Sequence, residues 1–234
     1  ALPHVRILGS DKAEEHNGIL TFVVDNVHPH DVSELLAADG VAVRAGHHCA
    51  EPLHRFLGYH ATVRASFAFY NDKTDVDRLA AYPPSGGAWA MTTNPFYNEI
   101  LTEHNVRPEF KHDLPDADLV LDGVNPSCGD EIQLQLKLDG DTIADGAFVG
   151  DGCAISQAST DIMLGMIVGK SREEALRLGD LFLRMIRGEA SEEEIDSLEE
   201  ASALRDVSHM PARVKCAMLG WRTLREALGE KTPS

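Results

Sequence analysis

The sequence predicts an α+β protein in which short strands and amphipathic helices form two separate pieces. The chain has 234 residues, of which 43% are hydrophobic and 25% charged, so it can bury a core. In some segments apolar and polar residues alternate with the period of two that is typical of strands, and in others apolar residues recur at helical spacing. A segment rich in proline and glycine separates the two pieces.

That separating segment reads Tyr-Pro-Pro-Ser-Gly-Gly-Ala at residues 82–88. Proline pairs favour extended backbone and glycine pairs favour flexible backbone, so we predict a linker over residues 83–93. The expected domains are then residues 1–82 and 94–230. The front piece carries 7 basic and 11 acidic residues and the remainder carries 14 and 27, so most of the net charge of −17 belongs to the back piece.

The front piece is predicted to alternate strands and helices. A buried strand is expected where β-branched and apolar residues follow Gly18, because turn residues bound the run on both sides. A helix is expected where Val32, Leu35 and Leu36 recur at helical spacing before Gly40. In chain order, the expected elements are a strand at 18–25, a helix at 31–39, strands at 41–44 and 63–69, and a helix at 72–81.

The back piece is predicted to have strands first and helices afterwards, which is the order of an α+β domain. Apolar and polar residues alternate over 132–138, and Asp139-Gly140 is typical of a hairpin turn before a returning strand at 142–149. The expected helices begin at Asn94-Pro95, at two capping boxes (Ser171 with Glu174, and Ser191 with Glu194) and near Pro211.

Charge and composition exclude several classes of protein. The net charge of −17 repels phosphate backbones, which argues against a general nucleic-acid partner. No run of 18 apolar residues is present, so no membrane span is expected. The first ten residues show no secretory signal, and the expected compartment is therefore the cytoplasm.

Three of the four cysteines, Cys128, Cys153 and Cys216, lie at predicted element boundaries. A hairpin brings Cys128 and Cys153 to the same end of the sheet, a helix supplies Cys216, and Asp130 adds a carboxylate beside Cys128. Three thiolates and one carboxylate suit four-coordinate zinc, although soft thiolates also suit iron or an iron–sulfur cluster. The alternative is that these cysteines are small buried hydrophobic residues, which fits one cysteine better than three.

Three motifs around these cysteines resemble the SufU proteins of the IscU/NifU-N iron–sulfur assembly superfamily, over about residues 95–228. They are Asn-Pro-x-Cys-Gly-Asp at 125–130, Gly-x-Gly-Cys-x-Ile-Ser at 150–156 and Ala-Arg-x-Lys-Cys-Ala at 212–217. The resemblance implies an antiparallel sheet packed with helices, a metal held by the four residues above, Cys128 as sulfur acceptor and Arg213 as a supporting residue. Lys215 stands where IscU scaffolds have histidine, and residues 171–209 resemble the SufU insertion. Both features favour zinc-dependent sulfur transfer over a cluster scaffold.

The front cysteine, Cys49, lies in the sequence Arg-Ala-Gly-His-His-Cys-Ala at residues 44–50. A thiol flanked by imidazoles can be held partly as a thiolate, with His48 in support, whereas the plainer interpretation is a solvated loop. Together with His-Pro-His-Asp at 28–31, Arg-Ala-Ser at 64–66 and Tyr-Asn at 70–71, this segment resembles the C-terminal part of SufS-type (group II) cysteine desulfurases. The resemblance covers about residues 5–80. It implies that Cys49 forms the persulfide and that Arg64 binds the carboxylate of the substrate cysteine.

Such desulfurases are fold-type I pyridoxal phosphate enzymes, so the resemblance implies that residues 1–82 form their small α/β C-terminal subdomain. In that family the Schiff-base lysine lies upstream of this segment. Lys12 and Lys73 are the lysines before the linker, and neither lies in a matching motif. We therefore expect no desulfurase activity from this chain alone. Pyridoxal phosphate would come with a missing N-terminal portion, the favoured interpretation, or with a separate SufS-type subunit.

A sulfur donor and its acceptor on one chain predict a relay from Cys49 to Cys128, followed by transfer to a downstream iron–sulfur scaffold complex. A short flexible linker would raise their effective concentration to about millimolar. Because Cys128 bound to zinc is a weak nucleophile, His30 is hypothesised to replace it on the metal; a solvated loop histidine is the alternative. Rival functions are a cluster assembly scaffold on the same ligands and an inert docking module.

Overall fold

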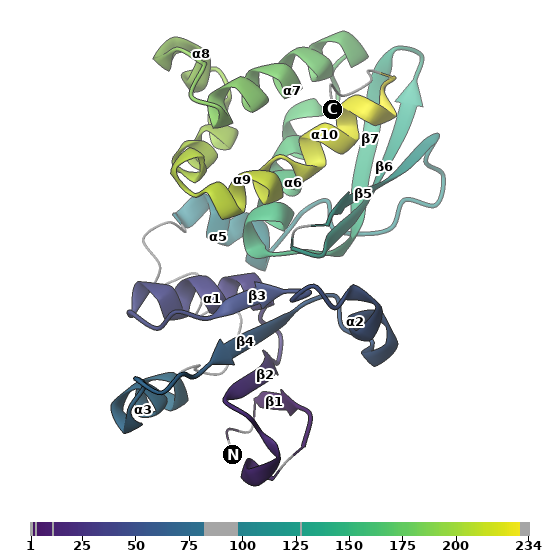
Figure 1. The fold of residues 1–234 in the computed structure, drawn as a ribbon. Coiled ribbons are helices and arrows are strands. Elements are labelled where there is room, and N and C mark those ends of the chain that lie inside the picture. The colour runs from purple at the N-terminus through teal and green to yellow at the C-terminus, as the bar shows by residue number, and fades with distance from the viewer. Residues whose placement is uncertain (1, 3, 11, 82–97, 127, 230–234) are drawn as a thin grey trace. The chain divides into compact units, whose positions relative to one another are not determined.

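The computed structural model describes residues 2, 4–10, 12–81, 98–126 and 128–229. The chain contains two compact units, one with Ala1–Pro95 and Ser127–Gly129 and the other with Phe96–Pro126 and Asp130–Ser234 (Figure 1). The linker predicted at 83–93 and the helix start predicted at Asn94-Pro95 lie outside the described residues. No helix within those ranges combines the length and apolar composition needed to cross a membrane.

The front unit is an antiparallel sheet covered by helices. Its described strands are β1 (Val5–Leu8), β2 (Ile19–Val24), β3 (Arg44–Gly46) and β4 (Thr62–Ser66), in the order β1-β2-β4-β3. Its helices are the short 3-10 helix η1 (Ala13–Glu15), α1 (Pro29–Ala38), α2 (Glu51–Leu57) and α3 (Lys73–Ala81). Helix α1 packs against β2, β3 and β4. The core joins apolar side chains of β2, β4, α1 and α3: Phe22, Val24, Val32, Leu36, Val63, Ala65 and Leu79.

Several sequence predictions for this unit need correction. The strand predicted at 41–44 is β3, which begins only at Arg44. The strand predicted at 63–69 ends at Ser66, because the next residues turn: the Asn71 amide donates to the Ala68 carbonyl and the Asn71 side chain accepts from the Ala68 amide. Phe69 is consequently 99% exposed. Strand β1 and helix α2 were not predicted.

The back unit is a three-stranded antiparallel sheet with helices packed against it. Its strands are β5 (Leu119–Asn125), β6 (Asp130–Asp139) and β7 (Thr142–Asp151), in the order β5-β6-β7. Its helices are α5 (Glu99–Val106), α6 (Ala154–Ile167), α7 (Arg172–Ile186), α8 (Glu192–Asp196), the 3-10 helix η2 (Glu199–His209), α9 (Pro211–Ala217) and α10 (Leu219–Ala227). Helices α6 and α10 contact the sheet, and α7 and η2 form an outer layer on α6 (Figure 1).

Two buried hydrogen bonds connect α6 with α9 and α10 in the back unit. The Trp221 indole stacks on Phe182 with ring centroids 4.4 Å apart, and its Nε1 donates to Ser159 Oγ at 3.1 Å. The Ser159 hydroxyl in turn donates to the Ala217 carbonyl at 2.7 Å. The sequence analysis predicted a single last helix, whereas the structure has two, α9 and α10, with Met218 between them. The Ser159 side chain bonds the carbonyl of Ala217, the last residue of α9.

Both predicted capping serines begin helices. Ser191 forms the complete box with Glu194 at the start of α8. Ser171 accepts from the Glu174 amide at the start of α7, but the Glu174 carboxylate bonds Arg177 and no reciprocal bond to Ser171 is shown. The capping box predicted at Ser171 is therefore present only in part.

The box at Ser191 leads to a stability prediction. Replacing Ser191 with alanine should lower the free energy of unfolding by about 1 kcal/mol, because the Glu194 amide loses its hydrogen-bond partner. Urea unfolding of the full chain, followed by circular dichroism, measures this difference. The control is Ser202→Ala, a half-buried serine within η2 that caps no helix start, with an expected change within about 0.5 kcal/mol. Equal losses in the two variants would contradict a capping contribution.

Candidate functional site

Strand pairing brings three distant parts of the back unit to one end of its sheet. Asn125 at the end of β5 pairs with Asp130 at the start of β6, and Glu131 pairs with Asp151 at the end of β7. Two residues after Asp151, Cys153 caps α6. Gly129, with φ of +85°, makes the turn between Cys128 and Asp130.

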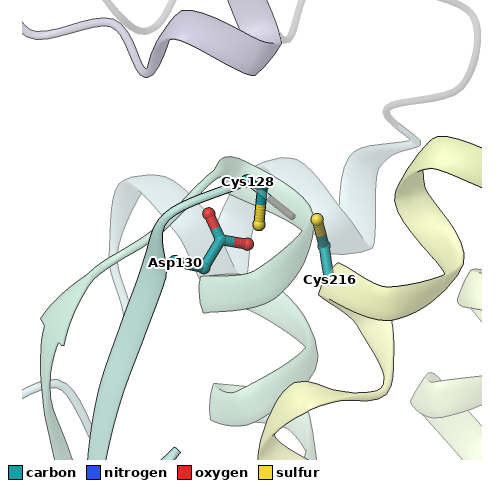
Figure 2. A group of neighbouring side chains, drawn as sticks. All are labelled: Cys128, Asp130 and Cys216. Atoms are coloured by element: carbon teal, nitrogen blue, oxygen red, sulfur yellow. The ribbon is translucent and has the colours of Figure 1, made fainter. Parts of the chain in front are cut away.

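Cys128, Asp130 and Cys216 lie together at this end of the sheet. Their two sulfurs and one carboxylate oxygen all lie within 4.8 Å of one another, and all three residues are buried. Figure 2 shows the three side chains pointing toward one another, with Cys216 supplied by α9. Ligand atoms of a tetrahedral zinc ion lie about 3.5–4 Å apart, so this spacing is close to that of a metal site.

Cys153 is buried beside this group, although its sulfur is outside the three-membered set. Its backbone N–H donates to Asp130 Oδ1 at 3.1 Å, which directs the carboxylate to the N-terminus of α6. Burial raises the pKa of the Cys153 thiol well above its usual value; a hydrogen bond with Cys216 and the charge of Asp130 raise it further, and Arg213 opposes this. Burial, Cys216 and Asp130 thus together disfavour ionisation of the Cys153 thiol.

Three other side chains define the surroundings of the cluster. Arg213 is 2% exposed and supplies a positive charge that acts on Cys153. The Asn125 side-chain amide donates to Cys216 Sγ at 3.7 Å, a contact for which the sequence analysis assigned no role. Lys215 is exposed on α9.

The donor set fits a divalent metal ion. Two thiols and one carboxylate are buried with their ligand atoms within 4.8 Å of one another, and a bound cation would stabilise thiolate and carboxylate ligands. Thiolate and carboxylate ligands match zinc, and they also match iron. Cys128, Asp130 and Cys216, with Cys153 beside them, therefore form a candidate metal centre.

The fourth cysteine, Cys49, belongs to the front unit and is exposed, whereas the other three are buried. It lies on the loop between β3 and α2, where His48 has φ of +53° and Cys49 has φ of +62°. Such left-handed backbone costs roughly 1–3 kcal/mol per non-glycine residue, and it persists only where the surroundings hold it. The loop that presents Cys49 is therefore strained.

The other front-unit candidates lie on different elements. Burial, then the charge of Arg64, lowers the pKa of His48 to about 4, so this imidazole is uncharged near pH 7 and brings no positive charge to Cys49. Arg64 lies on β4 and is half-buried, and its Nε has no hydrogen-bond partner among the described residues. His30 lies in the first turn of α1, and its backbone N–H donates to His28 Nδ1 at 3.3 Å.

The front lysines do not fit pyridoxal phosphate. The Lys12 side chain is 62% exposed and pairs with Glu15, and the Lys73 side chain is 86% exposed and pairs with Asp77. Residues 1–82 contain no other lysine. This segment therefore offers no buried lysine that could anchor the cofactor.

Residues 96–231 match the family model of the NifU-like N terminal domain. The chain belongs to this family. Residues 1–79 match a second model, aminotransferase class-V. The two resemblances inferred from the sequence motifs are thus confirmed, with a C-terminal aminotransferase class-V fragment preceding the NifU-like domain.

The segment of this chain that matches relatives of the NifU-like domain covers most of the length of those relatives. The zinc-dependent sulfurtransferase SufU of Bacillus subtilis (strain 168) is 41% identical over 135 residues, which cover 58% of this chain and 90% of that protein. The iron-sulfur cluster assembly scaffold protein IscU of Streptococcus pyogenes serotype M1 is 41% identical over 135 residues, 58% of this chain and 84% of that protein. The crystal structure of FiSufU from Fervidobacterium islandicum AW-1 matches with a TM-score of 0.55 and 39% identity, covering 58% of this chain and 98% of that one.

The front segment matches only part of its relatives. Probable cysteine desulfurase 2 of Mycobacterium leprae (strain TN) is 56% identical over 77 residues, which cover 33% of this chain. These residues span 18% of that protein. The likeness therefore concerns one segment of a desulfurase.

Two buried polar residues of the front unit were missed in the sequence analysis. Thr62 is 1% exposed and His54 is 7% exposed, and their side chains bond each other beside the Cys49 loop. Thr62 lies two residues before Arg64, within the buried part of β4. The polar Thr62 between the apolar residues Ala61 and Val63 was the signal available.

Proposed function

We propose that this protein serves iron–sulfur cluster assembly as a zinc-dependent sulfurtransferase, in which Cys49 carries persulfide sulfur and Cys128 accepts it. The observation that carries the proposal is the buried cluster of Cys128, Asp130 and Cys216. The name of the SufU relative supports zinc and sulfur transfer, and the desulfurase likeness of the front segment supports Cys49 as donor.

Zinc would be held by Cys128, Asp130, Cys153 and Cys216. When bound, it supplies the positive charge that keeps these buried thiols deprotonated. Arg213 adds a second positive charge beside the cluster. Asn125 orients Cys216 through its N–H···S contact.

Sulfur transfer needs no external oxidant or reductant. The Cys128 thiolate attacks the terminal sulfur of a persulfide on Cys49, and a new S–S bond forms to Cys128 Sγ. The S–S bond to Cys49 Sγ breaks, and Cys49 leaves as a thiolate. Because Cys49 is exposed, it can present the sulfur to an acceptor.

The sulfur on Cys49 would come from a SufS-type cysteine desulfurase, as an upstream portion or a separate subunit. Pyridoxal phosphate belongs to that component, because the lysines of residues 1–82 are exposed. We assign Arg64 to the carboxylate of the substrate cysteine, since its half-buried guanidinium has an unbonded Nε. The downstream partner would be an iron–sulfur scaffold complex.

A cluster assembly scaffold on the same ligands is the second candidate, favoured by the name of the IscU relative. Anaerobic reconstitution with iron and sulfide distinguishes the two. A stable cluster with visible absorbance supports the scaffold, and tight zinc without a cluster supports sulfur transfer. The exposed Lys215, in place of a histidine ligand next to Cys216, favours transfer.

The difference in exposure between Cys49 and the buried cysteines provides a direct test. Brief treatment of the zinc-loaded chain with ³⁴S-labelled inorganic polysulfide should load Cys49, because the other thiols are buried. Mass spectrometry of peptides at successive times should then find the label on Cys49 first and on Cys128 later. A Cys49→Ser chain that labels Cys128 equally fast overturns the relay. If that variant stays fully active with an added complete desulfurase, the front unit is a docking module instead.

Asn125 provides a prediction for metal binding. Asn125→Ala should weaken zinc binding about tenfold, because Cys216 loses a donor that orients and stabilises its thiolate. Competition with a chromophoric chelator measures the dissociation constant. Asn105→Ala on α5, a residue outside the three-membered cluster, is the control and should leave the constant unchanged. Equal affinities in the two variants would show that the N–H···S contact does not support the metal.

A further inference from the structure

The residues on both sides of Cys49 are tied to one buried threonine. His48 Nε2 lies 3.1 Å from the Thr62 carbonyl oxygen and 3.0 Å from its hydroxyl Oγ1. His54 Nε2 lies 3.0 Å from the same hydroxyl, and His54 Nδ1 lies 3.1 Å from the Ala50 carbonyl oxygen. The contacts therefore run from the residue before Cys49, through β4 and α2, to the residue after it.

The two carbonyl oxygens determine where the hydrogens lie. A carbonyl can only accept, so His48 Nε2 and His54 Nδ1 both carry a hydrogen. In neutral His54 the Nε2 then has a lone pair and accepts from the Thr62 hydroxyl. That hydroxyl is left to accept from His48. All donors point the same way, from His48 through Thr62 and His54 to Ala50.

The surroundings keep the His48 ring neutral near pH 7. Burial first, then the positive charge of Arg64 and the neighbouring His54, lowers the pKa of His48 to about 4. Thr62 and His54 are almost completely buried, so water does not compete readily for their bonds. These buried groups thus complete the hydrogen-bonded chain with one another.

We propose that Thr62 is the positioning residue for Cys49, because its hydroxyl joins the two histidines that tether the backbone on either side of the thiol. This inference rests on the proposed role of Cys49 as sulfur donor. The left-handed backbone of His48 and Cys49 is unfavourable by itself, so the loop needs such a tether to keep the thiol in one place. Transfer to another thiol depends on that placement, because a displacement of about 1 Å can slow a reaction up to 100-fold.

Three variants of the full chain test the role of the hydroxyl. Thr62→Val removes it at nearly constant volume, and Thr62→Ser retains it. Thr21→Val removes a hydroxyl from the neighbouring strand β2, where Thr21 pairs with Arg64, and serves as the control.

Thr62→Val should speed amide hydrogen exchange in residues 47–50 by about tenfold and slow sulfur transfer from Cys49 to Cys128 about tenfold. Alkylation of Cys49 by iodoacetamide should change less than about twofold, because the thiol is already exposed. Thr62→Ser and Thr21→Val should resemble the unchanged chain. A general loss of structure would speed exchange throughout the unit, whereas a positioning role affects exchange in this loop and the rate of transfer.

Nitrogen-15 spectra of the histidine rings test the hydrogen-bonded chain without any sulfur chemistry. The unchanged chain should show His54 protonated at Nδ1 and His48 at Nε2. The opposite tautomer at His54 overturns the proposal, as do unchanged exchange and transfer in folded Thr62→Val. If Thr62→Val does not fold, the proposal is tested by the ring tautomers of the unchanged chain and by the rate of sulfur transfer in Thr62→Ser, which should be normal. Labelling of Cys128 that persists in Cys49→Ser would contradict the proposed function. In that case the spectra still test whether Thr62 joins the two histidines.

Discussion

Replacing Cys128 with serine is expected to reduce the sulfur accepted from Cys49 by at least about 100-fold. A serine hydroxyl is not ionised near neutral pH and forms no persulfide, so the attacking atom is lost. The change also removes one of three potential ligand atoms that lie within 4.8 Å of one another. Peptide mass spectrometry after loading Cys49 with labelled sulfur measures the effect.

Cys216→Ser is the matched variant, because it removes a sulfur from the same cluster and leaves Cys128 in place. We expect zinc binding to weaken by more than about tenfold while Cys128 still becomes labelled. The pair of variants therefore separates the acceptor from the metal ligands. Label that moves to Cys153 or Cys216 in Cys128→Ser would contradict Cys128 as the acceptor.

The β6–β7 hairpin of the back unit followed from local signals in the sequence, whereas strand β5 was not predicted. The alternation before Asp139-Gly140 predicted the hairpin, and the hairpin predicted that the start of one strand and the end of the next meet at one edge. The observed register from Glu131 with Asp151 to Asp139 with Thr142 has this form. Cys153 indeed caps the following helix, at the position that the sequence analysis expected.

Features that depend on contacts between distant residues could not be predicted in this way. The Asn125 amide meets Cys216 across 91 residues of sequence, and Thr62 meets His48 through a bond that no periodicity encodes. The low pKa of His48 depends on burial, which the polar sequence around it did not indicate. Four-residue strand β1 was too short for its alternation to be informative.

Gly150 is expected to be among the positions least tolerant of a single added methyl group. It pairs with Ile132 in the sheet, and its φ of +128° is unfavourable for any side chain. A Cβ atom would overlap the Glu131 carbonyl oxygen and lie 3.0 Å from Ile132 Cα. Because backbone atoms cannot rotate away, Gly150→Ala should lower the free energy of unfolding by about 3 kcal/mol or more.

Gly140→Ala distinguishes the two causes of this loss, which are the positive φ and the overlap of an added Cβ with backbone atoms. It also has positive φ, +61°, but no atom lies within 4 Å of an added Cβ, so Gly140→Ala should cost only about 1 kcal/mol. Urea unfolding of both variants in the full chain, followed by circular dichroism, gives the comparison. Because Gly150 leads into the loop before Cys153, its variant should also bind zinc more weakly, whereas Gly140→Ala should not. Equal destabilisation by the two changes would mean that backbone conformation alone, and not the close approach of β6 and β7, requires glycine at position 150.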